Sequence, residues 1–309
     1  MMDFGLKFSA FFILCSWATR PRLYKIDKKE QLLTRKELPN TFKFLDEMAQ
    51  NFNIKPLHGI VVDGNYNAGV TSVGLTGRTI MYIGLPLFAV LTKEERLSLF
   101  AHEMGHIVNK DIKRSTYIGT ALQTAGAWFY LLNAPEEDAE DAFSVIAHFI
   151  LKLLSYIPYG ICYVLIHLHW QSKQRAEYLA DLFEAKVSGT ETAVSAIKKL
   201  HYSDMFYYTV QNVALQKKKD GLIDQFLSNV NSLPEKEVRR LLRKSELEQS
   251  RLDLTHPPHT FRMKFLEKNN RKGTMSLSDE KNKLIEQELE GFKNKIEGKL
   301  VDQYLYYLS

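Results

Sequence analysis

Residues 92–109 read TKEERLSLFAHEMGHIVN, and this stretch decides how the rest of the chain is interpreted. Thr92 and Glu95 form a capping box, in which each side chain accepts a hydrogen bond from the backbone amide of the other. The pattern predicts a helix from about Lys93 to Asn109, with an apolar side that includes Phe100.

Within this helix, His102 and His106 are separated by four positions and therefore lie on one face, about one turn apart. Two such imidazoles can hold one metal ion from a single rigid element. Glu103 projects beside them and can take a proton from water bound to the metal, whose pKa the metal lowers to about 7. The alternative interpretation is two surface histidines on an ordinary helix.

A third protein ligand is needed, because catalytic zinc sites usually have three. An HExxHxxGxxH site would require histidine at position 112, where Ile112 stands. The predicted helix 173–199 offers Glu177 and Asp181, four residues apart. Glu177 would bind the metal, and Asp181 would accept a hydrogen bond from a ligand imidazole. Without the HExxH motif, this carboxylate pair would be interpreted as a solvated helix face.

A small sheet is predicted to precede the metal-binding helix. Apolar residues at helical spacing indicate a helix over 37–53, and Pro56 ends it. Residues 58–63, 67–70 and 79–83 then have the composition of strands, separated by turns rich in glycine and asparagine. The sequence therefore predicts an α+β fold that is mostly α.

Two apolar stretches follow the HExxH helix, and each is long enough for a membrane-spanning helix of about 20 residues. Residues 116–134 hold no charged side chain, although threonines and a glutamine dilute their apolar character. Residues 142–170 contain one charged side chain, Lys152, and one proline, Pro158. We expect two transmembrane helices, and the alternative is a pair of long helices packed on a soluble core. The short run 8–18 is a possible membrane anchor or a buried segment.

Charges that flank the apolar stretches predict an orientation. Basic residues precede the first stretch and follow the second, whereas the link between them is acidic. The positive-inside rule then places the polar segments in the cytoplasm. The predicted organisation is an N-terminal segment 1–21, a catalytic domain formed by 22–114 and 171–309, and an inserted apolar helical hairpin 115–170.

Four motifs occur along the chain, namely residues 67–69 (NAG), 99–107 (LFAHEMGHI), 175–181 (RAEYLAD) and 255–262 (THPPHTFR). In this order they resemble the membrane-associated gluzincins, which include the bacterial heat-shock protease HtpX and the zinc CAAX-prenyl endopeptidases. The resemblance covers residues 55–266 and implies a zincin-like catalytic domain.

The resemblance implies that His102, His106 and Glu177 bind one Zn²⁺ ion per chain and that Glu103 is the general base. It also implies that one more element reaches the site, since His256 and Arg262 lie in the last motif. One of these two side chains would stabilise the oxyanion of the reaction, although His256 could equally be a loop residue packed by its neighbouring prolines.

The strand at Asn67 and Ala68 is implied to present its edge to an extended peptide substrate. Other partners are limited by composition. The net charge is +5, but the basic residues are spread out and no nucleic-acid motif is present. Cys15 and Cys162 lie in apolar runs without metal-binding spacing, so we expect no disulfide-linked partner and a metal site built from histidine and carboxylate.

The sequence therefore predicts an HtpX-like zinc endopeptidase, multi-pass in the cell membrane and in contact with its lipid, with its site facing the cytoplasm. Misfolded or membrane proteins are the substrates that the resemblance suggests. Two alternatives stay open. One is a zinc-bound protein that binds peptides or regulates without cleaving, against which the intact Glu103 argues. The other is a soluble peptidase whose long helices pack against protein.

Overall fold

A computed structural model of the chain describes residues 13, 17, 19, 20, 26, 30–74, 77–133, 142–216, 220–247 and 257–308. Most of the run 8–18, the acidic link before residue 142, and His256 lie outside the described residues. The chain forms two compact units, one of residues 1–24 and 113–173, the other of residues 25–112 and 174–309.

The second unit contains a three-stranded sheet in the order β1-β3-β2. The strands are β1 (Gly59–Asp63), β2 (Ala68–Val73) and β3 (Arg78–Gly84). Central β3 pairs parallel with β1 and antiparallel with β2. An isolated bridge from Leu33 to Ile60 extends the pairing beyond β1. Among the described residues, β2 is hydrogen-bonded as a strand along one edge only, so it is an edge strand.

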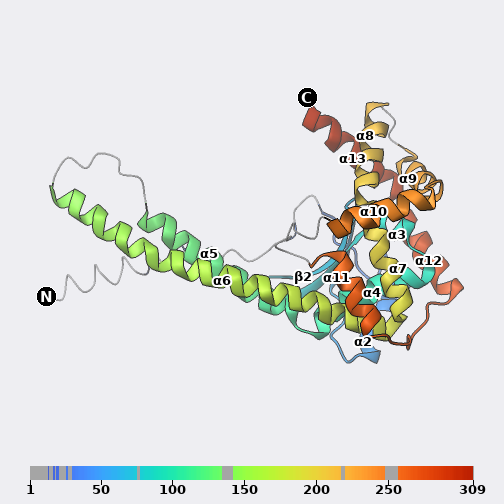
Figure 1. The fold of residues 1–309 in the computed structure, drawn as a ribbon, viewed down its shortest axis with the longest axis horizontal. Coiled ribbons are helices and arrows are strands. Elements are labelled where there is room, and N and C mark those ends of the chain that lie inside the picture. The colour runs from blue at the N-terminus through green and yellow to red at the C-terminus, as the bar shows by residue number, and fades with distance from the viewer. Residues whose placement is uncertain are drawn as a thin grey trace. The chain divides into compact units, whose positions relative to one another are not determined.

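Helices make up most of the rest of the chain (Figure 1). Those of the second unit surround one large apolar core, whose bulkiest fully buried side chains include Phe42, Phe88, Phe100 and Phe206. The prediction of a mostly helical α+β fold with a small sheet is confirmed. The helices are α2 (Pro39–Asn51), α3 (Leu85–Val90), α4 (Lys93–Val108), α5 (Asp111–Leu132), α6 (Ala142–Ser188), α7 (Thr190–Lys199), the 3₁₀ turn η1 (Leu200–Tyr202), α8 (Ser203–Leu215), α9 (Leu222–Asn231), α10 (Glu235–Leu247), α11 (His259–Lys268), α12 (Asp279–Glu290) and α13 (Lys293–Leu308).

Helix α4 is the helix that carries the HExxH motif, and its start follows the capping prediction. The Thr92 hydroxyl accepts from the Glu95 amide at 3.3 Å, and the Glu95 carboxylate accepts from the Thr92 amide at 2.8 Å. Leu97, Phe100 and Met104 are buried in the core. This burial fixes the rotation of α4, and with it the direction in which the motif faces.

The expectation of two transmembrane helices is wrong in number. Both apolar stretches are helical, but in the described part of the chain only α6 is long and apolar enough to cross a bilayer. In α5 the hydroxyls of Thr120 and Thr124 bond back to carbonyls of their own helix, and Asp111, Lys113 and Arg114 occupy its first turn. These polar groups lower the hydropathy of α5. Only 11% of the most apolar 18-residue stretch of α6 is buried within the chain.

Helix α6 is also longer than the sequence indicates. It continues through Pro158 and past residue 173, where a separate helix is predicted to begin, and ends at Ser188. The break falls at Gly189, which has a φ of +94°. A side chain on Gly189 would meet the backbone nitrogen of Gly273 at 3.3 Å, so both conformation and space favour glycine there. One helix therefore contains both the apolar segment and the acidic residues Glu177, Asp181 and Glu184.

Candidate metal centre

The candidate centre forms where α4 and α6 approach each other closely. A Cβ added to Gly105 would lie 3.0 Å from the Cα of Ala180, so only glycine permits this approach without displacement. As a result, the Nε2 atom of His102 lies 3.6 Å from Glu177 Oε2, and the Nε2 atom of His106 lies 3.7 Å from Glu177 Oε1. The structure thus brings together the three side chains that the sequence predicts as metal ligands, and their role as ligands stays a prediction.

These three side chains fit a zinc ion. The ligand atoms of His102, His106 and Glu177 all lie within 4.8 Å of one another. Zinc bonds of about 2.0–2.1 Å in tetrahedral geometry separate neighbouring ligand atoms by about 3.4 Å. The separations of 3.6 and 3.7 Å are close to that value and longer than ordinary hydrogen bonds. Two imidazoles and one carboxylate are also a donor set typical of catalytic zinc.

Carboxylates on the far side of both imidazoles hold the rings in place. His102 Nδ1 lies 3.1 Å from Glu184 Oε2 and 3.3 Å from Asp181 Oδ1. His106 Nδ1 lies 3.4 Å from Asp111 Oδ2. A proton on each Nδ1 leaves the Nε2 lone pair directed at the metal position, which is the tautomer that a zinc ligand requires.

Two of these carboxylates were not named from the sequence. Glu184 follows Asp181 by three residues and Glu177 by seven, so all three lie on one face of α6. That spacing is a signal from which Glu184 could have been found. Asp111 begins α5, and only the turn after α4 brings it to His106, so no helical spacing indicates it.

Arg262 from α11 joins this cluster from a distant part of the sequence. Its Nε and Nη2 atoms donate to the two oxygens of Asp181 at 2.9 and 2.6 Å, and Nη1 lies 3.3 Å from Glu177 Oε2. Burial alone would raise the pKa of Asp181, but Arg262 and His102 together outweigh it and lower that pKa. Asp181 and Arg262 therefore form a buried, ionised, two-pronged pair. The proposed action of Arg262 on an oxyanion stays a prediction.

The charge of the cluster suits a cation. Burial opposes a charged His102, yet Asp181, Glu177 and Glu184 together raise its pKa well above the ordinary value. Burial also raises the pKa of Glu184, and His102 offsets this only in part. Glu177, Asp181 and Glu184 are buried around Arg262, and this excess of carboxylates makes an environment that stabilises positive charge.

The other residues named from the sequence lie on nearby elements. Glu103 is buried on α4 directly after His102. Exposed Asn67 precedes β2, which packs against α4, and its carbonyl accepts from the Gly84 amide at 2.9 Å. Ala68 is the first residue of that edge strand. The roles of all three stay predictions.

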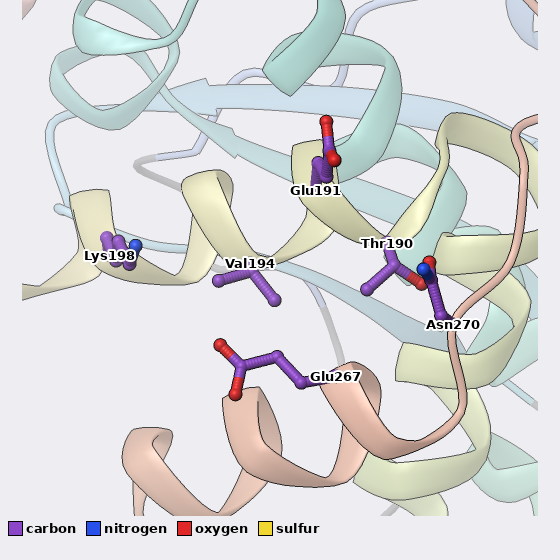
Figure 2. A pocket seen from close by; sticks show the side chains of 6 residues that line it. All are labelled: Thr190, Glu191, Val194, Lys198, Glu267 and Asn270. Carbon is purple, nitrogen blue, oxygen red and sulfur yellow. The ribbon is translucent and has the colours of Figure 1, made fainter.

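A separate hollow of about 290 Å³ lies between α7 and α11. Figure 2 shows Glu267 of α11 directed toward Val194 of α7. The residues that line the hollow are Thr190, Glu191, Val194, Lys198, Glu267 and Asn270. None of them belongs to the metal centre, and they offer no histidine.

An HExxH helix beside a small sheet, completed by a carboxylate from a later helix, defines a candidate metal centre of the metallopeptidase type. The chain belongs to peptidase family M48, whose family model matches residues 39–270. The match includes the edge strand and the HExxH helix, and it extends beyond Arg262.

The chain is also similar to proteins that are named as proteases. The chain is 26% identical over 208 residues to "Protease HtpX" of Tolumonas auensis, covering 64% of this chain and 69% of the relative. It is 28% identical over 214 residues to "Protease HtpX homolog" of Streptococcus agalactiae, covering 64% and 71%. With "Protease HtpX" of Glaesserella parasuis it shares 23% identity over 152 residues, or 47% of this chain, and spans only about half of that protein, 53%.

Proposed function

We propose that the chain is a zinc-dependent endopeptidase that hydrolyses peptide bonds in a membrane-associated setting. The observation that carries this proposal is the convergence of His102 Nε2, His106 Nε2 and the Glu177 carboxylate at separations suited to one zinc ion. Membership of peptidase family M48 and relatives named as proteases support it. When bound, zinc supplies Lewis acidity that makes water nucleophilic near neutral pH.

Glu103 performs the proton transfers in this proposal. It follows the first ligand on α4, and its side chain is buried with those of the centre. As general base it takes a proton from the attacking water, and it then returns that proton to the amine that leaves. Arg262 holds Asp181 and contacts Glu177, and it is positioned to stabilise negative charge in the centre.

The substrate binds as an added strand along β2. This strand packs against α4, and among the described residues its second edge has no strand partner. An extended peptide can pair with that edge through backbone hydrogen bonds that begin near Asn67 and Ala68. Such pairing recognises backbone rather than side chains, which suits a peptidase acting on unfolded segments.

Helix α6 gives the membrane part of the proposal. Its apolar segment is long enough to cross a bilayer and is little buried within the chain. The residues before α5 and after the apolar segment of α6 meet in one metal centre, so the chain enters and leaves the bilayer on the same side. We place that side in the cytoplasm, because basic Lys113 and Arg114 precede the apolar region and Lys173 follows it. Misfolded or membrane proteins are the substrates expected at such a location.

The test is cleavage of an unfolded protein such as casein by the purified chain and by Glu103→Gln, with zinc content measured on both. We expect zinc to be retained and the cleavage rate to fall by a factor of about 10² or more, since the general base is lost. Glu94→Gln is the matched control, because Glu94 lies on the same helix but is exposed, and its ion pair is with Lys93 rather than with the metal centre.

Unchanged cleavage by zinc-loaded Glu103→Gln would show that this mechanism is wrong. If wild type holds zinc and binds the unfolded protein but does not cleave it, the chain is instead a zinc-bound peptide-binding protein.

A further inference from the structure

Two carboxylates compete for one hydrogen atom on His102. A neutral imidazole that binds zinc through Nε2 carries a single N–H, at Nδ1. Glu184 Oε2 lies 3.1 Å and Asp181 Oδ1 lies 3.3 Å from that nitrogen. The two distances differ little, so the other partners of each carboxylate decide which of them orients the ring.

Asp181 is already engaged by Arg262. Its Oδ1 accepts from Nη2 at 2.6 Å, and its Oδ2 accepts from Nε at 2.9 Å. These are short, charge-assisted bonds in the two-pronged geometry that arginine and carboxylate prefer. The orientation of the Asp181 carboxylate is therefore set mainly by Arg262.

Glu184 has the opposite arrangement. Its Oε1 accepts from the Ser98 hydroxyl at 2.6 Å, which leaves Oε2 directed at His102. Ser188 donates to the Glu184 carbonyl at 3.0 Å and lies 2.9 Å from the Ser98 oxygen. Ser98, Glu184 and His102 are all buried or nearly so, so this chain of bonds between α4 and α6 is shielded from water.

A buried carboxylate is costly unless it serves an interaction. Glu184 is 2% exposed, and its two oxygens lie within hydrogen-bond distance of Ser98 and His102. Hydrophobic residues of similar volume would fill the same space without that cost. The position of the side chain, with one oxygen fixed and the other on a metal ligand, accounts for its presence.

We propose that Glu184 is a positioning residue of the metal centre, which orients His102 through Nδ1 and is itself fixed by Ser98. This inference rests on the proposed function, since it assigns His102 as a zinc ligand. Hydrogen-bond partners of zinc-bound histidine commonly change metal affinity by about 10–100-fold when removed. Residue 184 lies outside the four motifs from which the family resemblance was drawn.

The experiment measures metal affinity and coordination geometry directly. Zinc affinity is determined by competition with a chromophoric chelator, and the visible absorption of the cobalt-substituted chain reports the ligand field. We expect Glu184→Ala to bind zinc about 10–100-fold more weakly and to shift the cobalt spectrum. Glu184→Gln keeps an oxygen that can accept from Nδ1, so it should recover most of the affinity.

Glu297→Ala is the control for the loss of a buried carboxylate. Glu297 is fully buried and accepts from the Gly221 and Ile223 amides at 3.0 and 2.8 Å, and none of these three residues belongs to the metal centre. Its replacement should lower stability but leave zinc affinity and the cobalt spectrum unchanged. A role of Glu184 in folding alone would make the two variants behave alike.

Ser98→Ala keeps the test decisive if Glu184→Ala does not fold. It removes one hydroxyl and should weaken zinc binding several-fold, because Glu184 loses its anchor. Wild-type zinc affinity in folded Glu184→Ala, or in Ser98→Ala, would overturn the inference, as would a Glu184→Gln variant no better than alanine. If wild type itself binds no zinc, the proposed function fails. If wild type binds zinc and cleaves while Glu184→Ala matches it, only this inference fails.

Discussion

Helix α6 contains two segments with opposite patterns of burial. In residues 142–173, large apolar side chains are exposed, including Phe149 at 69% and Ile157 at 61%. In residues 174–188, three acidic side chains are buried instead. They are Glu177 at 6%, Asp181 at 0% and Glu184 at 2% exposure.

Exposed apolar side chains and buried charged side chains are both unfavourable in water, so each segment indicates what it contacts instead. Exposed apolar side chains on a long helix require an apolar surrounding, which a bilayer supplies. Buried carboxylates require compensating positive charge, which Arg262 supplies in part and which the proposed metal ion would complete. Under the proposed function, the two halves of α6 contact different non-protein partners: lipid for the apolar half and zinc for the acidic half.

The largest effect on stability is expected where the acidic segment loses its cation. Arg262→Ala leaves the buried Asp181 carboxylate without its two-pronged partner. Removing one member of a buried ion pair costs about 3–5 kcal/mol of unfolding free energy. Urea denaturation of the metal-free chain measures this loss, with exposed Arg243→Ala on α10 as control. A loss below 1 kcal/mol would mean that the pair is not buried as described.

The apolar segment is tested by placing a charge on it. Ile157 lies near the middle of the apolar stretch 142–170 and is exposed, and an aspartate at the centre of a spanning helix costs about 2.5–3.5 kcal/mol. We expect Ile157→Asp to shift the chain from the membrane pellet to the supernatant on carbonate extraction. Tyr207→Asp on α8 is the control, since Tyr207 is also exposed but outside α6. Equal extraction of wild type and Ile157→Asp would argue against insertion.

A smaller effect is expected at the edge strand that the proposed substrate approaches. Asn67 is exposed, so Asn67→Ala should change stability by less than about 0.5 kcal/mol. Asn67→Ala leaves the backbone pairing intact and removes only the hydrogen bond that the Asn67 side-chain amide would add to the bound peptide. Loss of that bond weakens binding by about 0.5–1.5 kcal/mol, or roughly 2- to 10-fold in KM, with kcat little changed. Steady-state kinetics on a peptide separate the two constants. A fall in kcat at constant KM would place Asn67 in the chemistry rather than in binding.

The smallest effect concerns pH. Burial lowers the pKa of His201 from its ordinary value of 6.5, and carbonyls of Lys198 and Ile197 oppose this only in part. The folded chain therefore favours neutral His201, and this stabilisation is present above the ordinary pKa and is lost as the pH falls through the lowered one. His201→Asn should flatten the decline of unfolding free energy between neutral and mildly acidic pH, by less than about 1 kcal/mol. Parallel curves for the two proteins would contradict the assignment.

The sequence predicted the local features of the molecule well. The capping box at Thr92, the spacing of His102 and His106, and the small sheet depend on neighbours within a few residues, which periodicity and turn residues reveal. The prediction of a second span failed. Threonine hydroxyls in α5 bond to carbonyls of their own helix, so the segment stays helical. The same polar groups reduce its apolar character, and α5 is not a candidate span.

Contacts between distant elements were less accessible from sequence. The pairing of Arg262 with Asp181 requires α11 to pack beside α6, and no periodicity encodes that approach. Glu184 was missed for a different reason. Its spacing from Glu177 was visible, but a buried carboxylate and a solvated one have the same sequence pattern, and only the Ser98 and His102 contacts distinguish them.

Zinc content per chain is the most direct test of the central claim. The protein, purified without affinity metals, is analysed by mass spectrometry of the metal alongside Glu177→Ala and the exposed-residue control Glu94→Gln. The account predicts one zinc per chain in wild type and control, and a large loss in Glu177→Ala, because two histidines alone leave the site short of its third ligand. Wild-type protein that binds no zinc, or a Glu177→Ala variant that holds zinc as tightly as wild type, would contradict it.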